Sequence, residues 1–543
     1  MKKYKADVVI AGGGLAGIVT ALELLNEGKT VTLLERGKEE NFGGLAKESF
    51  GGMFFVNSSQ QRKAGMKDSV ELALRDWHSV ADFGEEDILP KKWAEQYVNL
   101  CTNEVQIWLN KLGVKYFPVV HWVERGLHKP GNSLPRFHMV WGTGHGLTTA
   151  LISHLKSHPK ATSNLQLLFD HKCEEITVEG NRACGITGVS ELDGTEFSVV
   201  AENVVVATGG MGGNIQRVKD NWYKPWGTPP ERILNGSHPF CDGAMHDAVS
   251  NLKGHITHLD HQWHYAAGVN HPRPRWKNHG LSLVPPKSAL WFDYQGRRFG
   301  PEPLITAYDT RWTVEEICKQ KKKHSWQILN MKIMQKEFAI SGSEFNEAIR
   351  DKNLFGFVKN ILLGNKKLVK DMLDNCEDFV VAYSLEELVD KMNALEGNND
   401  VQFDFVKDGV ETYDANIDSG TRLHNDAQLR RIAHARQYQG DKVRTCNFQK
   451  IVDLKAMPLI AIREFILSRK TLGGIQTDVE SRVLSKPVLG QQEPIPGLFA
   501  VGECAGFGGG GVHGKGALEG TFLGGCVLTG RIAAKAICDK RLA

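Results

Sequence analysis

Residues 7–17 read Asp7-Val8-Val9-Ile10-Ala11-Gly12-Gly13-Gly14-Leu15-Ala16-Gly17. The apolar run is typical of a buried strand, and it leads into a Gly-x-Gly-x-x-Gly turn followed by a helical pattern. A second apolar run, residues 30–34, ends at Glu35, where a carboxylate can accept hydrogen bonds from a ribose. Together these features predict a βαβ unit over residues 5–36 that binds a dinucleotide.

Each glycine of the turn has its own expected role. Gly12 forms the tight turn, Gly14 lets backbone approach a pyrophosphate, and Gly17 lets the helix pack closely on the strand. The N-terminus of the helix then presents unpaired N–H groups to the phosphates. Glycine-rich turns between a strand and a helix also occur without a cofactor, so the turn alone does not decide the ligand.

Length and charge limit the classes of protein. A chain of 543 residues exceeds one ordinary core, so two or three domains are expected. The 66 Lys and Arg residues nearly balance the 63 Asp and Glu residues, for a net charge of +3, which argues against nucleic acid as the main partner. The basic run 319–324 is the local exception. It indicates either a solvated helix face or a site for a polyanion or acidic membrane.

The cysteines indicate a reducing compartment. The ten cysteines include no Cys-x-x-Cys pair, so a disulfide framework, a zinc knuckle and an attached c-type haem are not expected. Residues 1–5 superficially resemble the start of a signal peptide, but the apolar run that follows is the predicted first strand. No other run reaches the length of a membrane span. We therefore expect a cytoplasmic protein with no membrane span.

The distribution of strands and helices predicts a domain inserted into another. Residues 60–160 form a mostly helical excursion, with apolar periodicity over 69–77 and 93–112. Strand-like runs follow at 166–169, 175–178, 183–189, 197–200 and 203–207. Residues 1–245 and 456–543 are expected to form a Rossmann-like α/β domain, and 246–455 an inserted α+β capping domain. The active site is expected in the cleft between these domains.

One histidine cluster raises the question of a metal. His255, His258, His261 and His264 recur at i, i+3 spacing, with Asp260 among them. On a helix, two or three of these imidazoles could meet at a metal, whereas a strand would place them on opposite faces. Gly254 and Gln262-Trp263 indicate a mixed segment. We therefore expect no metal, and His264-Tyr265 are candidates to line a substrate cleft.

Several further motifs appear in order along most of the chain, and with them the chain resembles the FAD-dependent flavoproteins of the fumarate reductase, succinate dehydrogenase and 3-ketosteroid dehydrogenase superfamily. The motifs are Gly12 to Gly17 with Glu35, Gly43-Gly44, Ser49-Phe50-Gly51-Gly52, Ala207-Thr208-Gly209-Gly210, Asp242-Gly243, Gly296-Arg297-Arg298-Phe299 with Glu302, Thr471-Leu472-Gly473-Gly474 and Gly497 to Glu503. The tail from Gly508 to Gly514 with Ala517 to Gly525 is similar to a bacterial group of FAD-binding dehydrogenases akin to the ketosteroid enzymes.

The resemblance implies an FAD site. Its residues would be Gly12, Gly14, Leu15, Ala16 and Gly17 at the pyrophosphate, Glu35 and Arg36 near the adenosine ribose, Gly43, Gly44, Ser49, Gly51 and Gly52 towards the flavin ring, Ala207, Thr208, Gly209 and Asp242 on the wall, Gly502 and Glu503 near the ribityl chain, and Leu523 near the pyrimidine. Each of the later glycines is alternatively an ordinary turn residue.

Departures from the superfamily pattern narrow the implied chemistry. Members with covalent FAD carry a histidine about six residues before a Gly-Gly pair that corresponds to Gly51-Gly52. This chain has Leu45 at that place, so non-covalent FAD is implied. The proton-donating arginine of soluble fumarate reductases has no clear counterpart in residues 303–311. The arginine that they place after Val-His-Gly is missing from 515–518. Dicarboxylate reduction is therefore the weaker interpretation.

Four residues are candidates for catalysis. Ketosteroid dehydrogenases use a tyrosine base, and Tyr308 lies near the corresponding place, although with altered spacing. Arg311 could lower the pKa of that tyrosine or bind an anion, and Arg469 with Lys470 could polarise a carbonyl. His513, inside a glycine loop, could line the site. A core-filling ring for Tyr308 and ordinary salt bridges for the basic residues are the alternatives.

The preferred function is dehydrogenation of a CH–CH bond beside the carbonyl of a hydrophobic, steroid-like ketone, with flavin N5 accepting the hydride. One alternative is an enoate or fumarate-type reductase that runs the opposite reaction. Another is a flavoprotein electron-transfer subunit docked to a redox partner. The chain encodes no haem or iron–sulfur ligand set, so the electron acceptor is expected to be a separate molecule.

Overall fold

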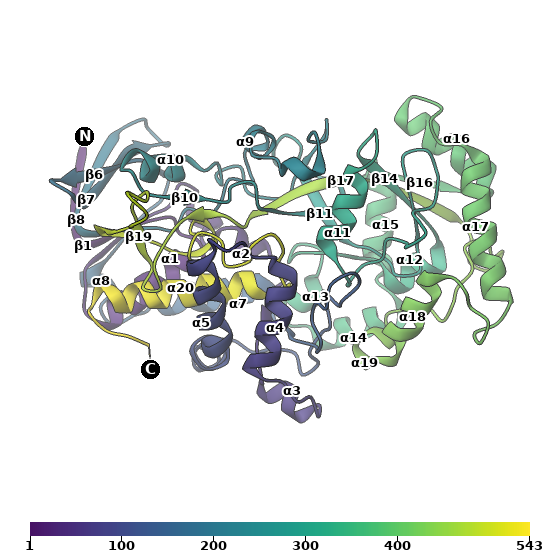
Figure 1. Ribbon diagram of the computed structural model, residues 1–543, viewed down its shortest axis with the longest axis horizontal. Coiled ribbons are helices and arrows are strands. Elements are labelled where there is room, and N and C mark those ends of the chain that lie inside the picture. Colours follow the sequence, from purple (N-terminus) through teal and green to yellow (C-terminus); the bar gives the residue numbers. More distant parts are fainter. Residues whose placement is uncertain (543) are drawn as a thin grey trace. The chain divides into compact units, whose positions relative to one another are not determined.

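The computed structural model describes residues 1–542, which divide into two compact units. Unit 1 contains residues 1–223, 237–263 and 469–542, and unit 2 contains residues 224–236 and 264–468. Figure 1 labels the elements of both units. Unit 2 is therefore an insertion, but its boundaries differ from the expected 246–455.

Strand pairing explains the difference at both boundaries. β10 (Ile256–Thr257) pairs with β18 (Gly474–Ile475), which fixes residues 246–263 in unit 1. β17 (Leu459–Thr471) pairs with strands of unit 2 along most of its length, so residues 456–468 belong there. Neither pairing can be read from local composition.

Unit 1 is built on a mostly parallel sheet in the order β19-β20-β8-β1-β2-β5, with β6 and β7 continuing from β8. These strands are β1 (Lys2–Ala11), β2 (Val31–Leu34), β5 (Leu165–Leu168), β6 (His171–Glu179), β7 (Arg182–Ser190), β8 (Glu196–Val206), β19 (Arg482–Leu484) and β20 (Pro494–Ala500). The pairs β1–β2, β1–β8, β2–β5 and β8–β20 are parallel. This is the predicted Rossmann-like arrangement, with the two runs at 197–207 joined into one strand.

The first and last helices of unit 1 pack against each other. Almost every residue of α1 (Leu15–Asn26) is buried, because α20 (Thr521–Ile537) lies along it. A Cβ on Gly530 would lie 2.8 Å from the Ala16 carbonyl oxygen, so only glycine permits this approach. Arg531 pairs with the buried Glu23 at 3.1 Å. Residues far apart in sequence thus form one layer on the sheet.

The helical excursion predicted for 60–160 is confirmed. It contains α3 (Ser59–Lys63), α4 (Val70–Ala81), α5 (Ile88–Leu100), the π-helical turn η2 (Cys101–Ile107), α6 (Trp108–Lys111) and α7 (Thr143–Lys156). The remaining elements of unit 1 are η1 (Glu39–Asn41), α2 (Gly44–Glu48), β3 (Gly52–Phe54), β4 (Phe137–Met139), α8 (Ala161–Asn164), α9 (Ile215–Asp220), α10 (Ala244–Asn251) and η4 (Gly502–Cys504). β3 and β4 form a separate antiparallel pair.

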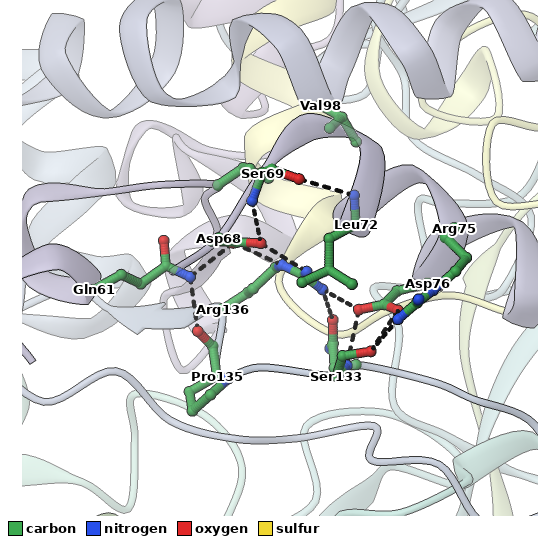
Figure 2. A network of polar contacts seen from close by, with 12 residues as sticks. Gln61, Asp68, Ser69, Leu72, Arg75, Asp76, Val98, Ser133, Pro135 and Arg136 are labelled. Atoms are coloured by element: carbon green, nitrogen blue, oxygen red, sulfur yellow. Dashed lines mark hydrogen bonds and ion pairs between the residues drawn. The ribbon is translucent and has the colours of Figure 1, made fainter. Parts of the chain in front are cut away.

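A buried ion network ties this excursion together (Figure 2). The Arg136 side chain, with no exposed surface, donates to Asp68 at 2.8 Å and to Asp76 at 2.6 Å. Asp76 also accepts hydrogen bonds from the backbone and hydroxyl of Ser133. Because Asp76 lies on α4 and Arg136 directly precedes β4, the network fastens α4 to the β3–β4 pair.

Unit 2 is an α+β unit around one sheet, in the order β13-β14-β17-β11-β12-β15, with β9 and β16 also pairing with β17. Its strands are β9 (Leu234–Asn235), β11 (Gln262–Asn270), β12 (Gly280–Val284), β13 (Leu290–Phe292), β14 (His324–Asn330), β15 (Ala339–Ile340), β16 (Phe379–Ala382) and β17. Its helices are η3 (Lys224–Trp226), α11 (Thr310–Cys318), α12 (Met331–Glu337), α13 (Glu347–Arg350), α14 (Leu354–Leu363), α15 (Lys366–Asn375), α16 (Leu385–Glu396), α17 (Phe403–Asp418), α18 (Ala427–Gln437) and α19 (Gln439–Lys442).

The basic run 319–324 connects α11 to β14 and is engaged locally. Lys319 pairs with Glu316, Lys322 pairs with Asp400, and Lys323 donates to backbone carbonyls of residues 226 and 228. His324 is buried. The run is therefore neither a continuous helix face nor an open cationic patch. Within residues 1–542, no helix is long and apolar enough to cross a membrane.

We predict that Arg136→Met destabilises unit 1 by about 3–5 kcal/mol, because it leaves the buried carboxylates of Asp68 and Asp76 without their cation. Arg75→Ala is the matched control, since the Arg75 side chain is 65% exposed and its pair with Asp76 is long, at 3.6 Å. The control is expected to cost less than about 1 kcal/mol. Denaturant and thermal unfolding of both variants measure the difference, and equal costs would contradict the account.

Candidate functional site

A pocket in unit 1 opens where four parallel strands end. β1, β2, β8 and β20 end at Ala11, Leu34, Val206 and Ala500. The residues next in the chain, Gly12, Glu35, Ala207 and Val501, all line the pocket. Ligands of open α/β sheets bind outside the carboxyl ends of the strands, so the pocket lies where the fold predicts a ligand.

The pocket wall includes most of the residues predicted from sequence. Of those, Gly12, Gly14, Leu15, Ala16, Glu35, Arg36, Gly44, Ser49, Ala207, Thr208, Gly209, Asp242, Glu503, Leu523 and Arg469 line it. The wall also includes residues that the sequence did not single out for the cofactor, namely Gly37, Asn41, Leu45, Ala46, His171, Lys172, Cys173, His238, Phe240, Cys241, Gly243, Ala244, Met245, Lys470, Phe507, Phe522 and Cys526. Gly243 and Phe522 belong to motifs named above, and Leu45 and Lys470 were considered for other roles, whereas no local motif marks the rest of this group.

The three glycines of the turn have different surroundings, as their separate expected roles require. A Cβ on Gly14 would meet no atom within 4 Å, so this position faces open space. A Cβ on Gly12 would lie 2.4 Å from the Ala207 carbonyl oxygen, and one on Gly17 would lie 2.0 Å from the Gly12 carbonyl oxygen. Gly14 is also the N-cap of α1 and has no side-chain cap. The turn therefore presents uncapped N–H groups to the pocket, as anion binding requires.

Glu35 is held by the backbone around it. One carboxylate oxygen accepts a hydrogen bond from the Gly13 N–H at 2.8 Å, and the other accepts from the Gly37 N–H at 2.6 Å. Burial raises the pKa of the Glu35 carboxyl, while these backbone bonds oppose the rise. Each oxygen keeps a further acceptor position, so the side chain can also receive a hydroxyl from the pocket.

Arg36 fixes a loop of the pocket wall. It pairs with Glu191 at 2.7 Å and with Asp242 at 2.9 Å, and its guanidinium lies 4.4 Å from the centre of the Phe240 ring. Asp242 also accepts the Ala244 N–H at 2.9 Å. The two residues thus hold the segment around Phe240 against the strand ends.

Several predicted glycines serve packing and do not line the pocket. A Cβ on Gly51 would lie 2.7 Å from the backbone of Thr143, and one on Gly52 would lie 1.7 Å from the Phe137 ring. Gly43 adopts φ +111° beside Thr148, and Gly502 adopts φ +69° with its N–H donated to Thr529. Gly17 packs on Gly12. These five positions require glycine whether or not a ligand is bound.

Two half-buried residues of opposite charge, Lys470 and Glu503, lie on the pocket wall. Burial lowers the pKa of Lys470 to about 8, and its ammonium nitrogen lies 3.9 Å from the centre of the Phe522 ring. Burial raises the pKa of Glu503 to about 7, and its carboxylate accepts the Thr471 N–H at 3.0 Å. Arg469 precedes Lys470 and lines the same pocket. Both titrations fall near neutral pH, as is common at functional sites.

His513 does not line the pocket. Its imidazole has no exposed surface, stacks on Trp77 at 5.6 Å with an interplanar angle of 8°, and bonds to the Thr521 hydroxyl at 2.8 Å. Since that hydroxyl donates to the Leu518 carbonyl, Nε2 of His513 acts as the donor. Burial lowers the pKa of His513 to about 3, so the ring is neutral. The surrounding glycines suggested exposure, but Trp77 covers the ring.

Tyr308 and Arg311 lie in unit 2. Tyr308 is 1% exposed, its hydroxyl donates to the Arg431 carbonyl at 3.2 Å, and the Arg431 guanidinium lies 5.1 Å from the ring centre. The Arg311 guanidinium lies 4.7 Å from the centre of the Trp226 ring. Burial, with Arg311 nearby, lowers the pKa of His264 to about 3. Neither Tyr308 nor Arg311 is among the residues that line the unit 1 pocket.

The four clustered histidines do not assemble. His264 belongs to unit 2, and His255 bonds to Gln476 at 2.7 Å. The possible ligand atoms of His258, Asp260 and His261 lie within 4.8 Å of one another. However, the rings of His258 and His261 stack at 4.5 Å with an interplanar angle of 8°, and His258 already bonds to Asp87 at 2.7 Å. Parallel rings direct their lone pairs along parallel lines, so they do not converge tetrahedrally on one ion.

Comparison with known proteins agrees with the fold and the pocket. The model of the FAD binding domain family matches residues 7–523. A KsdD-like steroid dehydrogenase of Mycobacterium tuberculosis is 39% identical over 98% of this chain and 96% of its own length. A KsdD-like steroid dehydrogenase of Mycolicibacterium smegmatis is 39% identical over 95% of this chain and 96% of its own length.

Two solved structures share the fold. The 3-ketosteroid delta1-dehydrogenase of Sterolibacterium denitrificans aligns with a TM-score of 0.72 at 17% identity, covering 99% of this chain and 100% of that one. A flavocytochrome c3 fumarate reductase aligns with a TM-score of 0.68 at 20% identity, covering 99% of this chain and 78% of that one. The chain belongs to the FAD binding domain family, within its FAD-dependent, KsdD-like dehydrogenases.

The pocket fits the cofactor of this family. The open space at Gly14 beside the uncapped N-terminus of α1 suits a pyrophosphate, and the buried Glu35 has acceptor positions for ribose hydroxyls. Gly44, Ser49, Glu503 and Leu523, for which the resemblance implies places near the flavin or the ribityl chain, line the same wall. We propose that this pocket is the FAD site.

We predict that Gly14→Ala weakens FAD binding at least tenfold and leaves the apo-protein as stable as the wild type. The added methyl meets no protein atom but occupies the space expected for the pyrophosphate. Titration of apo-protein with FAD and thermal unfolding of the apo-protein measure the two effects. Gly17→Ala is the contrasting variant, because its Cβ would lie 2.0 Å from the Gly12 carbonyl oxygen and should destabilise the apo-protein itself. Undiminished FAD binding by Gly14→Ala would place the pyrophosphate elsewhere.

Proposed function

We propose that the protein dehydrogenates a hydrophobic, steroid-like ketone at the CH–CH bond beside its carbonyl. The observation that carries the proposal is the cationic pair Arg469-Lys470 on the wall of the proposed FAD pocket. The 39% identity to proteins described as KsdD-like steroid dehydrogenases supports the substrate class. Bound FAD would supply the hydride acceptor.

The proposed cofactor is bound without a covalent link. Leu45 lines the pocket at the place where covalent members of the superfamily carry a histidine, and a leucine side chain cannot form that bond. The electron acceptor is proposed to be a separate molecule. All ten cysteines are free thiols, which supports a reducing cytoplasm as the working compartment.

Arg469 and Lys470 are proposed to polarise the substrate carbonyl. Removal of a proton beside a carbonyl places negative charge on the carbonyl oxygen, and a fixed cation in a buried pocket stabilises that charge strongly. Lys470 is held for this task by the Phe522 ring and by the attraction of Glu519, which itself accepts the Trp263 indole N–H at 2.9 Å.

Tyr308 is the proposed base, and His513 is proposed as a positioning residue. The contacts of Tyr308 with the Arg431 carbonyl and guanidinium fix its orientation in unit 2. Arg311 is proposed to bind the polar end of the substrate. The neutral His513 donates to Thr521 and packs on Phe522, which in turn contacts Lys470.

Anaerobic mixing of the FAD-loaded protein with a panel of substrates tests the function. We expect 4-androstene-3,17-dione or a related steroid ketone to bleach the visible flavin absorbance, and an artificial dye to restore it. If fumarate, and not steroid enones, reoxidises the photoreduced protein, the activity is that of a reductase. If no substrate is turned over with a dye as acceptor, an electron-transfer subunit is the better description.

Two variants test the assigned roles in the same assay. Tyr308→Phe removes the proposed base and should lower the rate of bleaching by about a hundredfold or more. Arg469→Met should lower it by a similar factor through loss of carbonyl polarisation. Both variants are expected to retain FAD, because neither side chain belongs to the phosphate turn. If a variant keeps the wild-type rate, the substituted residue does not have the role proposed for it.

We further predict that kcat/KM falls as pH rises through about 8. Lys470 carries its proton below its pKa of about 8 and loses its charge above it, so its contribution to polarising the carbonyl, beside that of Arg469, is present only on the acid side. Lys470→Arg keeps the charge and should abolish this fall. Lys515→Arg is the control, since Lys515 pairs with Asp82 at the surface, and it should leave the profile unchanged. A wild-type profile that stays flat across this pH range would contradict the role of Lys470.

A further inference from the structure

One helix of unit 2 exposes apolar side chains that soluble surfaces usually bury. No residue of α14 is fully buried, and Leu354, Phe355, Val358, Leu362 and Leu363 are 63%, 81%, 44%, 69% and 62% exposed. Scattered exposed apolar residues are ordinary, but a contiguous group of them marks an interaction site. We call these five side chains the α14 stripe.

The stripe is distinct from the face that attaches α14 to its unit. Leu354, Val358 and Leu362 recur every four residues, so they follow one line along the helix, with Phe355 beside them. Phe357 and Ile361, on the neighbouring side of the helix, are half-buried. Residues that favour helix termini stand at both ends of α14, since Asn353 caps its N-terminus and Gly364 follows its last residue. α14 is therefore a formed helix with one attached face and one unpartnered apolar face.

The segment that contains the stripe, between Asp351 and Asp371, is basic. Residues 352–370 contain five lysines and no aspartate or glutamate. Lys352, Lys359 and Lys366 are exposed and form no ion pair with any residue that the structure describes. Lys367 and Lys370 pair with Glu347 and Asp374, which lie outside this segment. An apolar stripe flanked by unpaired lysines is the pattern of a helix that lies in a membrane interface.

This charge pattern favours one of the possible binding partners of the α14 stripe over another. A second copy docked stripe to stripe would bring the same lysines of both copies together, which is unfavourable. An anionic bilayer satisfies both parts of the surface, because its acyl boundary receives the apolar side chains and its headgroups pair with the lysines. We propose that α14 docks the protein peripherally on anionic lipid bilayers.

The docking should be reversible and dependent on charge. A lysine near an anionic surface strengthens binding by about fivefold, so the three unpaired lysines together contribute on the order of a hundredfold. A helix of ten residues cannot span a bilayer. The proposal is independent of the catalytic one, because no residue of α14 lines the FAD pocket.

Vesicle co-sedimentation of the FAD-loaded, full-length protein tests the proposal. Vesicles of phosphatidylcholine alone are compared with vesicles that also contain phosphatidylglycerol. We expect binding to the anionic vesicles, at least tenfold weaker binding to the neutral ones, and loss of binding as salt is raised. Failure of the wild-type protein to bind anionic vesicles at low salt would overturn the proposal.

Two sets of variants separate the stripe from its lysines. Phe355→Ser with Leu362→Ser should weaken binding at least tenfold, and Lys352→Gln, Lys359→Gln and Lys366→Gln together should weaken it by up to about a hundredfold. The controls are Leu454→Ser with Leu489→Ser, at positions 89% and 101% exposed, and Lys63→Gln, Lys92→Gln and Lys111→Gln at exposed sites of unit 1. The controls should bind as the wild type does.

The same variants also distinguish lipid binding from self-association through the α14 stripe. If the wild type is a dimer by light scattering and Phe355→Ser with Leu362→Ser makes it monomeric, the stripe is a self-association surface and the lipid proposal is wrong. Binding that the α14 variants and the controls weaken equally would also overturn it. Since all the substituted side chains are exposed, thermal unfolding should show no loss of folding in any variant.

Discussion

The FAD pocket depends on a close approach of backbone to backbone at the end of β1. A side chain at Gly12 would collide with the Ala207 carbonyl, and one at Gly17 would collide with the Gly12 carbonyl. Without this contact, the end of β8 could not lie directly beside the phosphate turn. The parallel register of β1 with β8, and of β8 with β20, then places Val501 and Glu503 on the same wall. The pocket thus results from the order of the strands and from the absence of a side chain at Gly12 and Gly17.

Two side chains of opposite charge lie on the pocket wall at the end of the same sheet. Lys470 and Glu503 are half-buried, and the loss of water around them moves their pKa values towards neutrality from opposite sides. Each would be costly alone, and each lowers the cost of the other. Arg136 with its two aspartates is a similar device elsewhere in unit 1, but its groups have no access to the pocket and serve stability alone.

The sequence allowed the strand ends and the phosphate turn to be predicted, because both depend on local pattern. Gly12, Glu35 and Ala207 directly follow strands whose apolar runs are visible, Glu503 lies three residues beyond the end of β20, and all four line the pocket. Phe240 and Cys173 could not be found this way, since the contact of Arg36 with Asp242 and Glu191 brings their segments together.

Other differences between the predicted and the observed site arise because the identity of a glycine or a histidine does not indicate which residues pack against it. The pattern identifies Gly52 correctly but cannot tell a flavin from the Phe137 ring that lies against it. It places His513 in a glycine loop but does not reveal that Trp77, from a distant helix, covers the ring. Likewise, residues 246–263 have the composition of the insertion, and only the pairing of β10 with β18 assigns them to unit 1.

The packing of α20 on α1 has a consequence for biosynthesis. The pocket takes its wall from the phosphate turn at Gly12 and also from Leu523 and Cys526 on α20. On the ribosome, the turn emerges first, whereas α20 emerges only after unit 2 has been synthesised. The nascent chain must therefore carry an unfinished, partly apolar cavity for most of its translation. Cofactor loading is then a late event, because the wall is complete only after α20 has been synthesised.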